Sequence, residues 1–267
     1  LFRNEQRWFA TMKKDIKVIE LTSSRLRFLD QTRLPGREVM IETADYRDVI
    51  EAIRRLRLRG APLIGIAAAY GVAIAAHAWL RRHPDRVGNP AAPFRKEMLA
   101  VCDAFAATRP TAVNLFWALA RIREILGYPL TPGLLTEALE NEAREIHDDD
   151  ARRCAAIGGF GADCIPVNAG VVTHCNSGAL ATGGEGTAFS VLLEAHRQGK
   201  GIHVYADETR PLLQGARLTM WELQRHGIPS TLITDGSAAM LMRQGRIHLA
   251  ITGADRVPLA PAFGKDD

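Results

Sequence analysis

The stretch VVTHCNSGALATGGEGTA, residues 171–188, decides the fold of this chain. An apolar segment leads into a loop of small residues rich in glycine, and Thr187 then begins the apolar-periodic segment FSVLLEAHRQG. This order predicts a strand, a glycine loop and a helix. Backbone N–H groups at a helix N-terminus lack partners and lie at the positive end of the helix dipole, so the loop suits an anion such as phosphate. The glycine spacing matches neither G-x-G-x-x-G nor a Walker loop.

From Gly170 onward, strand and helix patterns alternate with short links. The strand-like segments are GVVTHC, GIHVYAD, STLITD and IHLAITGAD, and the helix-like segments between them are TAFSVLLEAHRQG, PLLQGARLTMWELQRHG and SAAMLMRQG. This alternation predicts a parallel, doubly wound sheet, which binds ligands beyond the carboxyl ends of its strands. We therefore expect one rim of the sheet to carry Cys175, Asp207, Asp235 and Asp255.

The first 160 residues predict a different arrangement. The alternating segments KVIEL, RLRFLD and EVMIET predict a small antiparallel sheet, and Asp45 is a candidate N-cap for a helix that ends at Arg59-Gly60. Helix patterns recur in FRKEMLAVCDAFAA, in AVNLFWALARIREILG and over residues 131–150. We therefore expect an α/β protein with a strand-and-helix domain, including a helical bundle, over residues 1–160. Residues 161–267 are expected to form the parallel-sheet domain.

Composition narrows the class of protein. The 267 residues carry a formal net charge of +4, with arginine spread along the chain, which argues against a nucleic-acid partner and for a small anionic ligand at most. The four cysteines form no C-x-x-C pair, as is typical of a reducing, cytoplasmic setting. The uncharged segment over residues 61–80 is long enough to span a bilayer, but its alanine and glycine content favours a buried helix, and we expect no membrane association.

Two residues at the predicted rim are candidates for chemistry. Cys175 lies at a strand end beside a helix N-terminus, which suits a reactive thiol, whereas a small buried hydrophobe is the ordinary alternative. Asp255 is a candidate proton carrier, or it caps a helix or pairs with Arg256. His174 would point away from the Cys175 face if strand alternation continues. Since the histidines show no metal-like arrangement, we expect no metal.

Three further residues are candidates for binding. Arg59 and Arg109 each end a predicted helix, so they are either partners of the helix dipole or bidentate phosphate ligands. Gln214 has no evident structural task and is placed to reach a sugar hydroxyl.

At these residues the chain resembles the methylthioribose-1-phosphate isomerase family, the aldose–ketose isomerases of methionine salvage. The matching segments are RGAPLIGIAAAYGVA (59–73), TRPTAVNLFWAL (108–119), THCNSGALATGGEGTA (173–188), VYADETRPLLQGARLTMWEL (204–223), LITDGSAAMLM (232–242) and ITGADRV (251–257). The resemblance implies a cytoplasmic homodimer with a Rossmann-like second domain, no cofactor and a phosphorylated sugar as substrate. The wider superfamily contains ribose-1,5-bisphosphate isomerases and regulatory subunits of a translation-initiation exchange factor, and both stay as alternatives.

The resemblance also assigns roles to single residues. It implies that Asp255 is the acid–base residue and that Cys175 is its partner at the reacting carbons, in a reaction of assisted ring opening and hydrogen transfer from C2 to C1. Substrate contacts are implied for three residues of the first loop, for the phosphate-binding arginine and for the sugar-binding glutamine, namely Arg59, Gly60, Ala61, Arg109 and Gln214. The family continues past G-A-D-R with an Asn-Lys pair that contacts substrate. Here VPLAPAFGKDD follows, and the pair is not found. The resemblance therefore implies that the second domain is truncated at its C-terminus, or that the sequence joins residues across a missing segment.

Overall fold

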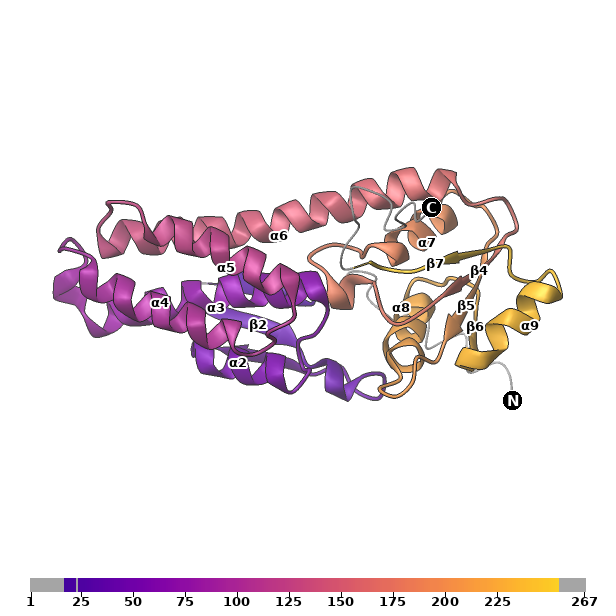
Figure 1. The fold of residues 1–267 in the computed structure, drawn as a ribbon, viewed down its shortest axis with the longest axis horizontal. Coiled ribbons are helices and arrows are strands. Elements are labelled where there is room, and N and C mark those ends of the chain that lie inside the picture. The colour runs from indigo at the N-terminus through magenta and orange to yellow at the C-terminus, as the bar shows by residue number, and fades with distance from the viewer. Residues whose placement is uncertain (1–16, 23, 255–267) are drawn as a thin grey trace, which may run out of the picture.

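The computed structural model describes residues 17–22 and 24–254, which form an elongated molecule with a helical half and a parallel-sheet half (Figure 1). Three strands, β1 (Ile19–Thr22), β2 (Arg25–Leu29) and β3 (Met40–Thr43), pair antiparallel in sequence order. The helix α2 (Tyr46–Arg54) follows, and the Asp45 carboxylate accepts the N–H of Arg47, as its N-cap role predicts. This part of the predicted fold is confirmed.

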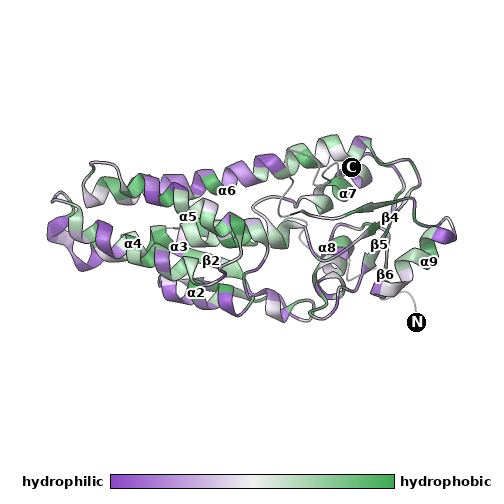
Figure 2. Cartoon of the chain, viewed as in Figure 1, coloured by the Kyte–Doolittle hydropathy of each residue, from purple (hydrophilic) through white to green (hydrophobic). Residues whose placement is uncertain are grey.

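The apolar segment of the sequence forms α3 (Ala61–Arg82), the central helix of the first half. Fifteen of its residues are buried, and 83% of its most apolar stretch lies inside the protein, so it is a core helix, although its length and composition alone would let it cross a membrane. Figure 2 shows the apolar colour of α3 beside the mixed colours of α2, α4 and α6. The prediction of a buried helix is confirmed.

The loop before α3 departs from the sequence-based expectation. The helix α2 ends at Arg54, five residues earlier than predicted, and Gly60 begins α3 instead of ending α2. The φ angle of Gly60 is 104°, and a Cβ there would lie 2.4 Å from the Cα of Ala181. Glycine is therefore required where this loop crosses the glycine loop of the second half.

Three helices complete the bundle around α3. They are α4 (Ala92–Ala106), α5 (Val113–Leu126) and α6 (Pro132–Asp163). The helix α6 packs against α3 and α5 at one end and against α7 (Ala188–Arg197) of the second half at the other (Figure 1). It extends 13 residues beyond the predicted end at residue 150. The division of the chain at residue 160 stays a prediction, and it falls in the last turn of this shared helix.

The second half is a parallel sheet in the strand order β6-β5-β4-β7. Its strands are β4 (Gly170–Thr173), β5 (His203–Asp207), β6 (Ser230–Ile233) and β7 (Leu249–Ile251). One face packs against α7 and α8 (Met220–Arg225), and the other against α9 (Ala238–Arg243), in two separate apolar clusters. The helix α8 continues a π-helical turn over Gly215–Thr219. The predicted doubly wound architecture is confirmed.

The strand order places the functional site. The chain moves outward from β4 through β5 to β6, and then returns to place β7 on the other side of β4. Connections that leave in opposite directions open a crevice at the carboxyl ends of the strands between them. The glycine loop after β4 and the segment Thr252–Ala254 after β7 meet at this crevice.

Candidate functional site

A cavity of about 820 Å³ lies at this crevice, between the parallel sheet and the start of α3. Six of the seven residues predicted for the site line it: Arg59, Gly60, Ala61, Arg109, Cys175 and Gln214. The seventh, Asp255, lies outside the described residues. The three residues that precede it, Thr252–Ala254, line the cavity. The structure thus brings the described candidates together, and their individual roles stay predictions.

The cavity wall is suited to an anion. The first residues of α3, α5 and α7, or the residues just before them, line it, so the positive ends of three helix dipoles meet there. None of these three helices has a side-chain cap hydrogen bond. Four arginines also line the cavity: Arg55, Arg59, Arg109 and Arg217. Within the described part of the chain, no aspartate or glutamate belongs to the lining.

Cys175 has an unusual backbone conformation. The strand β4 ends at Thr173, and Cys175 has a φ of 62°, in the left-handed region. Two threonines fix this turn: Thr209 Oγ1 accepts the N–H of Cys175 at 2.8 Å, and the hydroxyl of Thr219 donates to its carbonyl oxygen at 2.5 Å. Because the chain turns here, strand alternation stops and His174 lines the same cavity as Cys175. The expectation that His174 points away from the Cys175 face is wrong.

A buried polar network holds the loop after Cys175. Asn176 accepts two hydrogen bonds from the Arg59 guanidinium, at 2.5 Å to Oδ1 and 3.2 Å to its backbone oxygen. Its amide nitrogen donates to Glu222 Oε2 at 2.5 Å, and the N–H of Leu180 donates to Glu222 Oε1 at 3.2 Å. Burial lowers the pKa of Arg59, against the opposing fields of Cys175 and Glu222. The first half of the molecule is thereby tied to the glycine loop of the second.

Glu222 is the buried end of this network. It is fully buried, and burial raises the pKa of its carboxyl from the ordinary 4.5 to about 7, while the bonds from Asn176 and Leu180 and the charge of Arg59 act in the opposite direction. A Cβ on Gly178 would lie 2.3 Å from Glu222 Oε2, so the loop approaches the carboxylate as closely as glycine allows.

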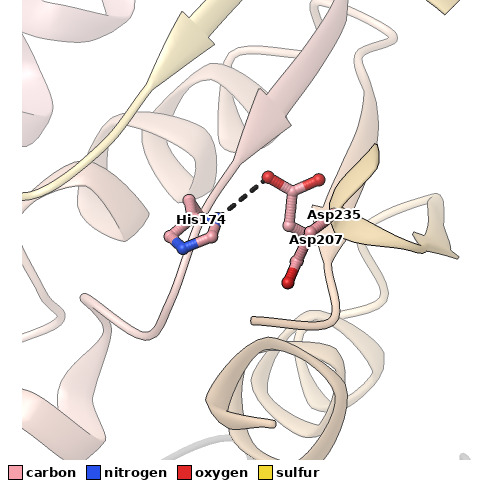
Figure 3. Close-up of side chains that lie close together, drawn as sticks. All are labelled: His174, Asp207 and Asp235. Atoms are coloured by element: carbon pink, nitrogen blue, oxygen red, sulfur yellow. Dashed lines mark hydrogen bonds and ion pairs between the residues drawn. The ribbon is translucent and has the colours of Figure 1, made fainter. Parts of the chain in front are cut away.

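Beside Cys175, three titratable side chains gather at the rim (Figure 3). His174 Nδ1 lies 3.0 Å from Asp207 Oδ2, and Asp235 accepts the backbone N–H groups of Thr209 and Arg210 at 2.8 and 2.9 Å. These backbone bonds lower the pKa of Asp235. One ligand atom from each of the three side chains lies within 4.8 Å of the others, a spacing that a cation could bridge. That the protein uses no metal stays a prediction.

Sequence reasoning missed several of these residues. Asn176 has no motif signal beyond its place next to Cys175. Glu222 did carry one, because it follows Leu218 by four residues on the apolar face of a helix, where a carboxylate requires partners. Asp207 and Asp235 were expected at the rim and are found there.

Comparison with known proteins identifies the family of the chain. Residues 57–259 match the model of the initiation factor 2 subunit family. The methylthioribose-1-phosphate isomerase of Geobacter sulfurreducens is 49% identical over 243 residues, which cover 90% of this chain and 68% of that protein. The protein of the same name from Syntrophotalea carbinolica is 50% identical over 246 residues, covering 91% and 69%.

Two solved structures have closely similar folds. The 5-methylthioribose 1-phosphate isomerase of Pyrococcus horikoshii superposes with a TM-score of 0.82 at 34% identity, over 92% of this chain and 67% of that one. The translation initiation factor eIF-2B subunit delta from A. fulgidus gives 0.79 at 37% identity, over 91% and 69%. The chain therefore belongs to the initiation factor 2 subunit family, within its methylthioribose-1-phosphate isomerase branch.

Proposed function

We propose that the chain is an aldose–ketose isomerase that converts 5-methylthioribose 1-phosphate to 5-methylthioribulose 1-phosphate, a step of methionine salvage. The observation that carries the proposal is one cavity that joins Cys175 to Arg59, Arg109 and Gln214, in a chain about half identical to isomerases of this name. The ligand is a phosphorylated sugar, and no cofactor takes part.

We assign the phosphate of the substrate to the N-termini of α3, α5 and α7. A phosphate there accepts backbone N–H groups and gains from three converging dipoles, and Arg109 supplies a guanidinium that forms no ion pair with the described residues. Arg59, Gly60 and Ala61 contact the substrate from the loop before α3. These contacts would fix the sugar ring in register with the reacting groups.

The other end of the substrate is apolar, and the cavity offers a matching wall. Leu212 lines the cavity and is 51% exposed, so its side chain offers apolar surface to a ligand. A methylthio group would cover it. Gln214, two residues after Leu212, is placed to bind a sugar hydroxyl.

The reaction must first open the sugar ring. The anomeric oxygen carries phosphate, so no free aldehyde forms spontaneously. We assign proton donation to the ring oxygen to Asp255. Hydrogen then moves from C2 to C1, either as a proton through an enol-type intermediate with Cys175 as base, or as a direct hydride shift. Turnover in deuterated water separates the two, because deuterium at C1 of the product requires an exchanging base.

Two alternatives remain within the same cavity. A ribose-1,5-bisphosphate isomerase would need further basic residues for its second phosphate, whereas Leu212 offers an apolar side chain to the ligand. A non-catalytic sensor of sugar phosphates or nucleotides is the second alternative, and the similar structure of the A. fulgidus subunit favours it over unrelated classes. Ligand binding that survives Cys175→Ala and Asp255→Asn, without turnover by the wild type, would establish the sensor.

The setting of the enzyme is part of the proposal. We expect a cytoplasmic homodimer without nucleic-acid or membrane partners, supported by four free cysteines and by the burial of α3 in the core. Sedimentation at micromolar concentration tests the dimer, and a monomer would contradict it.

The deciding experiment is incubation with 5-methylthioribose 1-phosphate and measurement of ketose formation. Cys175→Ala and Asp255→Asn are expected to abolish turnover, because each removes a group assigned to the reacting atoms. Cys164→Ala is the matched control, since this exposed cysteine caps the far end of α6. Wild-type levels of turnover in the Cys175 and Asp255 variants would refute the assigned roles, and no turnover by the wild type would refute the function.

A further inference from the structure

His174 stands between a buried carboxylate and the open cavity. Asp207 accepts a hydrogen bond from His174 Nδ1 at 3.0 Å, and its side chain is buried, with the residue 8% exposed. The imidazole of His174 is half exposed and lines the cavity. In Figure 3 the second ring nitrogen, Nε2, points away from Asp207. Asp207 itself does not belong to the cavity lining. A ligand in the cavity therefore meets the imidazole, and the carboxylate lies behind it.

The carboxylate determines what the imidazole can do. A hydrogen bond from Nδ1 to a carboxylate keeps the proton of the neutral ring on Nδ1 and leaves Nε2 as a proton acceptor. Within the described chain, Asp207 Oδ1 has no hydrogen-bond partner. Among the described residues, the imidazole of His174 is therefore the group that bonds the Asp207 carboxylate.

Hydrogen bonds hold His174 and Asp207 in place next to Cys175. Thr209 accepts the N–H of Cys175 through its hydroxyl oxygen and donates that hydroxyl to the backbone oxygen of Asp207 at 3.2 Å. Asp235 in turn anchors the N–H groups of Thr209 and Arg210. Among the described residues, the charged groups that act on His174 are Asp207 and Asp235, and Arg210 acts on Asp235. Such a fixed position suits a side chain that must contact the substrate in one orientation.

We propose that His174 is a proton carrier of the candidate site and that Asp207 is its positioning residue. This inference rests on the proposed function. When the ring oxygen takes a proton from Asp255, the bond from C1 to that oxygen breaks. After hydrogen has moved from C2 to C1 by either route, the O2 hydroxyl bond supplies the electron pair of the new carbonyl, and its proton passes to His174 Nε2. Exchange with solvent then returns a proton to Asp255.

A cation held by the three side chains is the competing interpretation. The hydrogen bonds already present favour the proton carrier, because both Asp235 oxygens accept backbone N–H groups and Asp207 Oδ2 is bonded to the ring. The two interpretations differ in their response to chelation. Loss of turnover on treatment with EDTA, restored by Mn²⁺ alone, would overturn the proton-carrier role.

The test uses a histidine deletion with chemical rescue. His174→Ala is expected to lower kcat about 100-fold, as is typical for loss of a proton-transfer group, and added imidazole should restore part of the rate. Asp207→Asn should lower kcat with little change in KM, because the ring loses its orientation and not its contact with the substrate. His203→Ala is the matched control, since His203 bonds Thr231 at the opposite end of β5. A folded His174→Ala variant that retains wild-type kcat, or that imidazole does not rescue, overturns the proposal.

A second measurement does not depend on turnover. In ¹⁵N NMR of the wild type, neutral His174 is expected as the Nδ1-protonated tautomer, and Asp207→Asn should remove this preference. An Nε2-protonated ring in the wild type would overturn the positioning role even if the protein is no isomerase. Absence of wild-type turnover together with the expected tautomer would instead count against the proposed function alone.

Discussion

Replacing Glu222 with glutamine should change how the stability of the protein depends on pH. The folded state raises the pKa of this carboxyl from 4.5 to about 7, so the folded form binds a proton more tightly than the unfolded form. Stability from this group is fully present below the unfolded pKa and is lost as pH rises through 7. Between pH 5 and pH 8 the wild type should lose about 2–3 kcal/mol from this source, at roughly 1.4 kcal/mol per pKa unit.

Glu222→Gln cannot ionise and should not show this loss. Its amide replaces one acceptor oxygen with a donor, which faces the Asn176 or Leu180 nitrogen, so the variant should be less stable at pH 5 by about 1–3 kcal/mol. At pH 8 the two proteins should therefore come close together in their free energies of unfolding.

Urea unfolding of both proteins at pH 5 and pH 8 measures the effect. Glu137→Gln is the matched control, because Glu137 is exposed on α6 and its substitution should leave the pH dependence of stability unchanged. If the free energies of wild type and Glu222→Gln change in parallel between the two pH values, the burial of an ionisable Glu222 is refuted.

Two further substitutions test the site. Gly178→Ala should lower the free energy of unfolding by about 1–3 kcal/mol, because the added Cβ would lie 2.3 Å from a Glu222 oxygen. A variant that unfolds at the same denaturant concentration as the wild type would contradict this contact. Arg109→Met should raise KM for the phosphorylated sugar about 10- to 100-fold with a smaller change in kcat, as expected for loss of a charged hydrogen bond. Unchanged initial-rate kinetics would show that Arg109 does not bind the phosphate.

Local patterns predicted the elements around the site well. The strand, glycine loop and helix at residues 171–188 follow from apolar periodicity and from glycine content, and the rim positions of Asp207 and Asp235 follow from the parallel sheet. These features depend on residues that are close in sequence, so a single sequence is enough to predict them. That residues of both halves line one cavity followed from the resemblance and not from apolar periodicity.

Features that depend on tertiary packing escaped prediction. The helix α6 was expected to end near residue 150, and the glycines beyond that point do disfavour a helix. In the structure Gly158 lies against the backbone of Ser190 and Gly161 against Val191, so close packing on α7 requires small residues there and overrides propensity. The contact of Arg59 with Asn176 joins residues 117 apart, and no local pattern encodes it.

The length of α6 has a mechanical consequence. A helix of 32 residues is about 48 Å long, and this one is clamped by α3 and α5 near its start and by α7 near its end. Because this helix packs against both halves, a hinge motion of one half relative to the other would require the helix to bend. We therefore expect substrate to enter through movement of short loops at the cavity mouth, with the two walls of the cavity held at a constant spacing throughout the catalytic cycle.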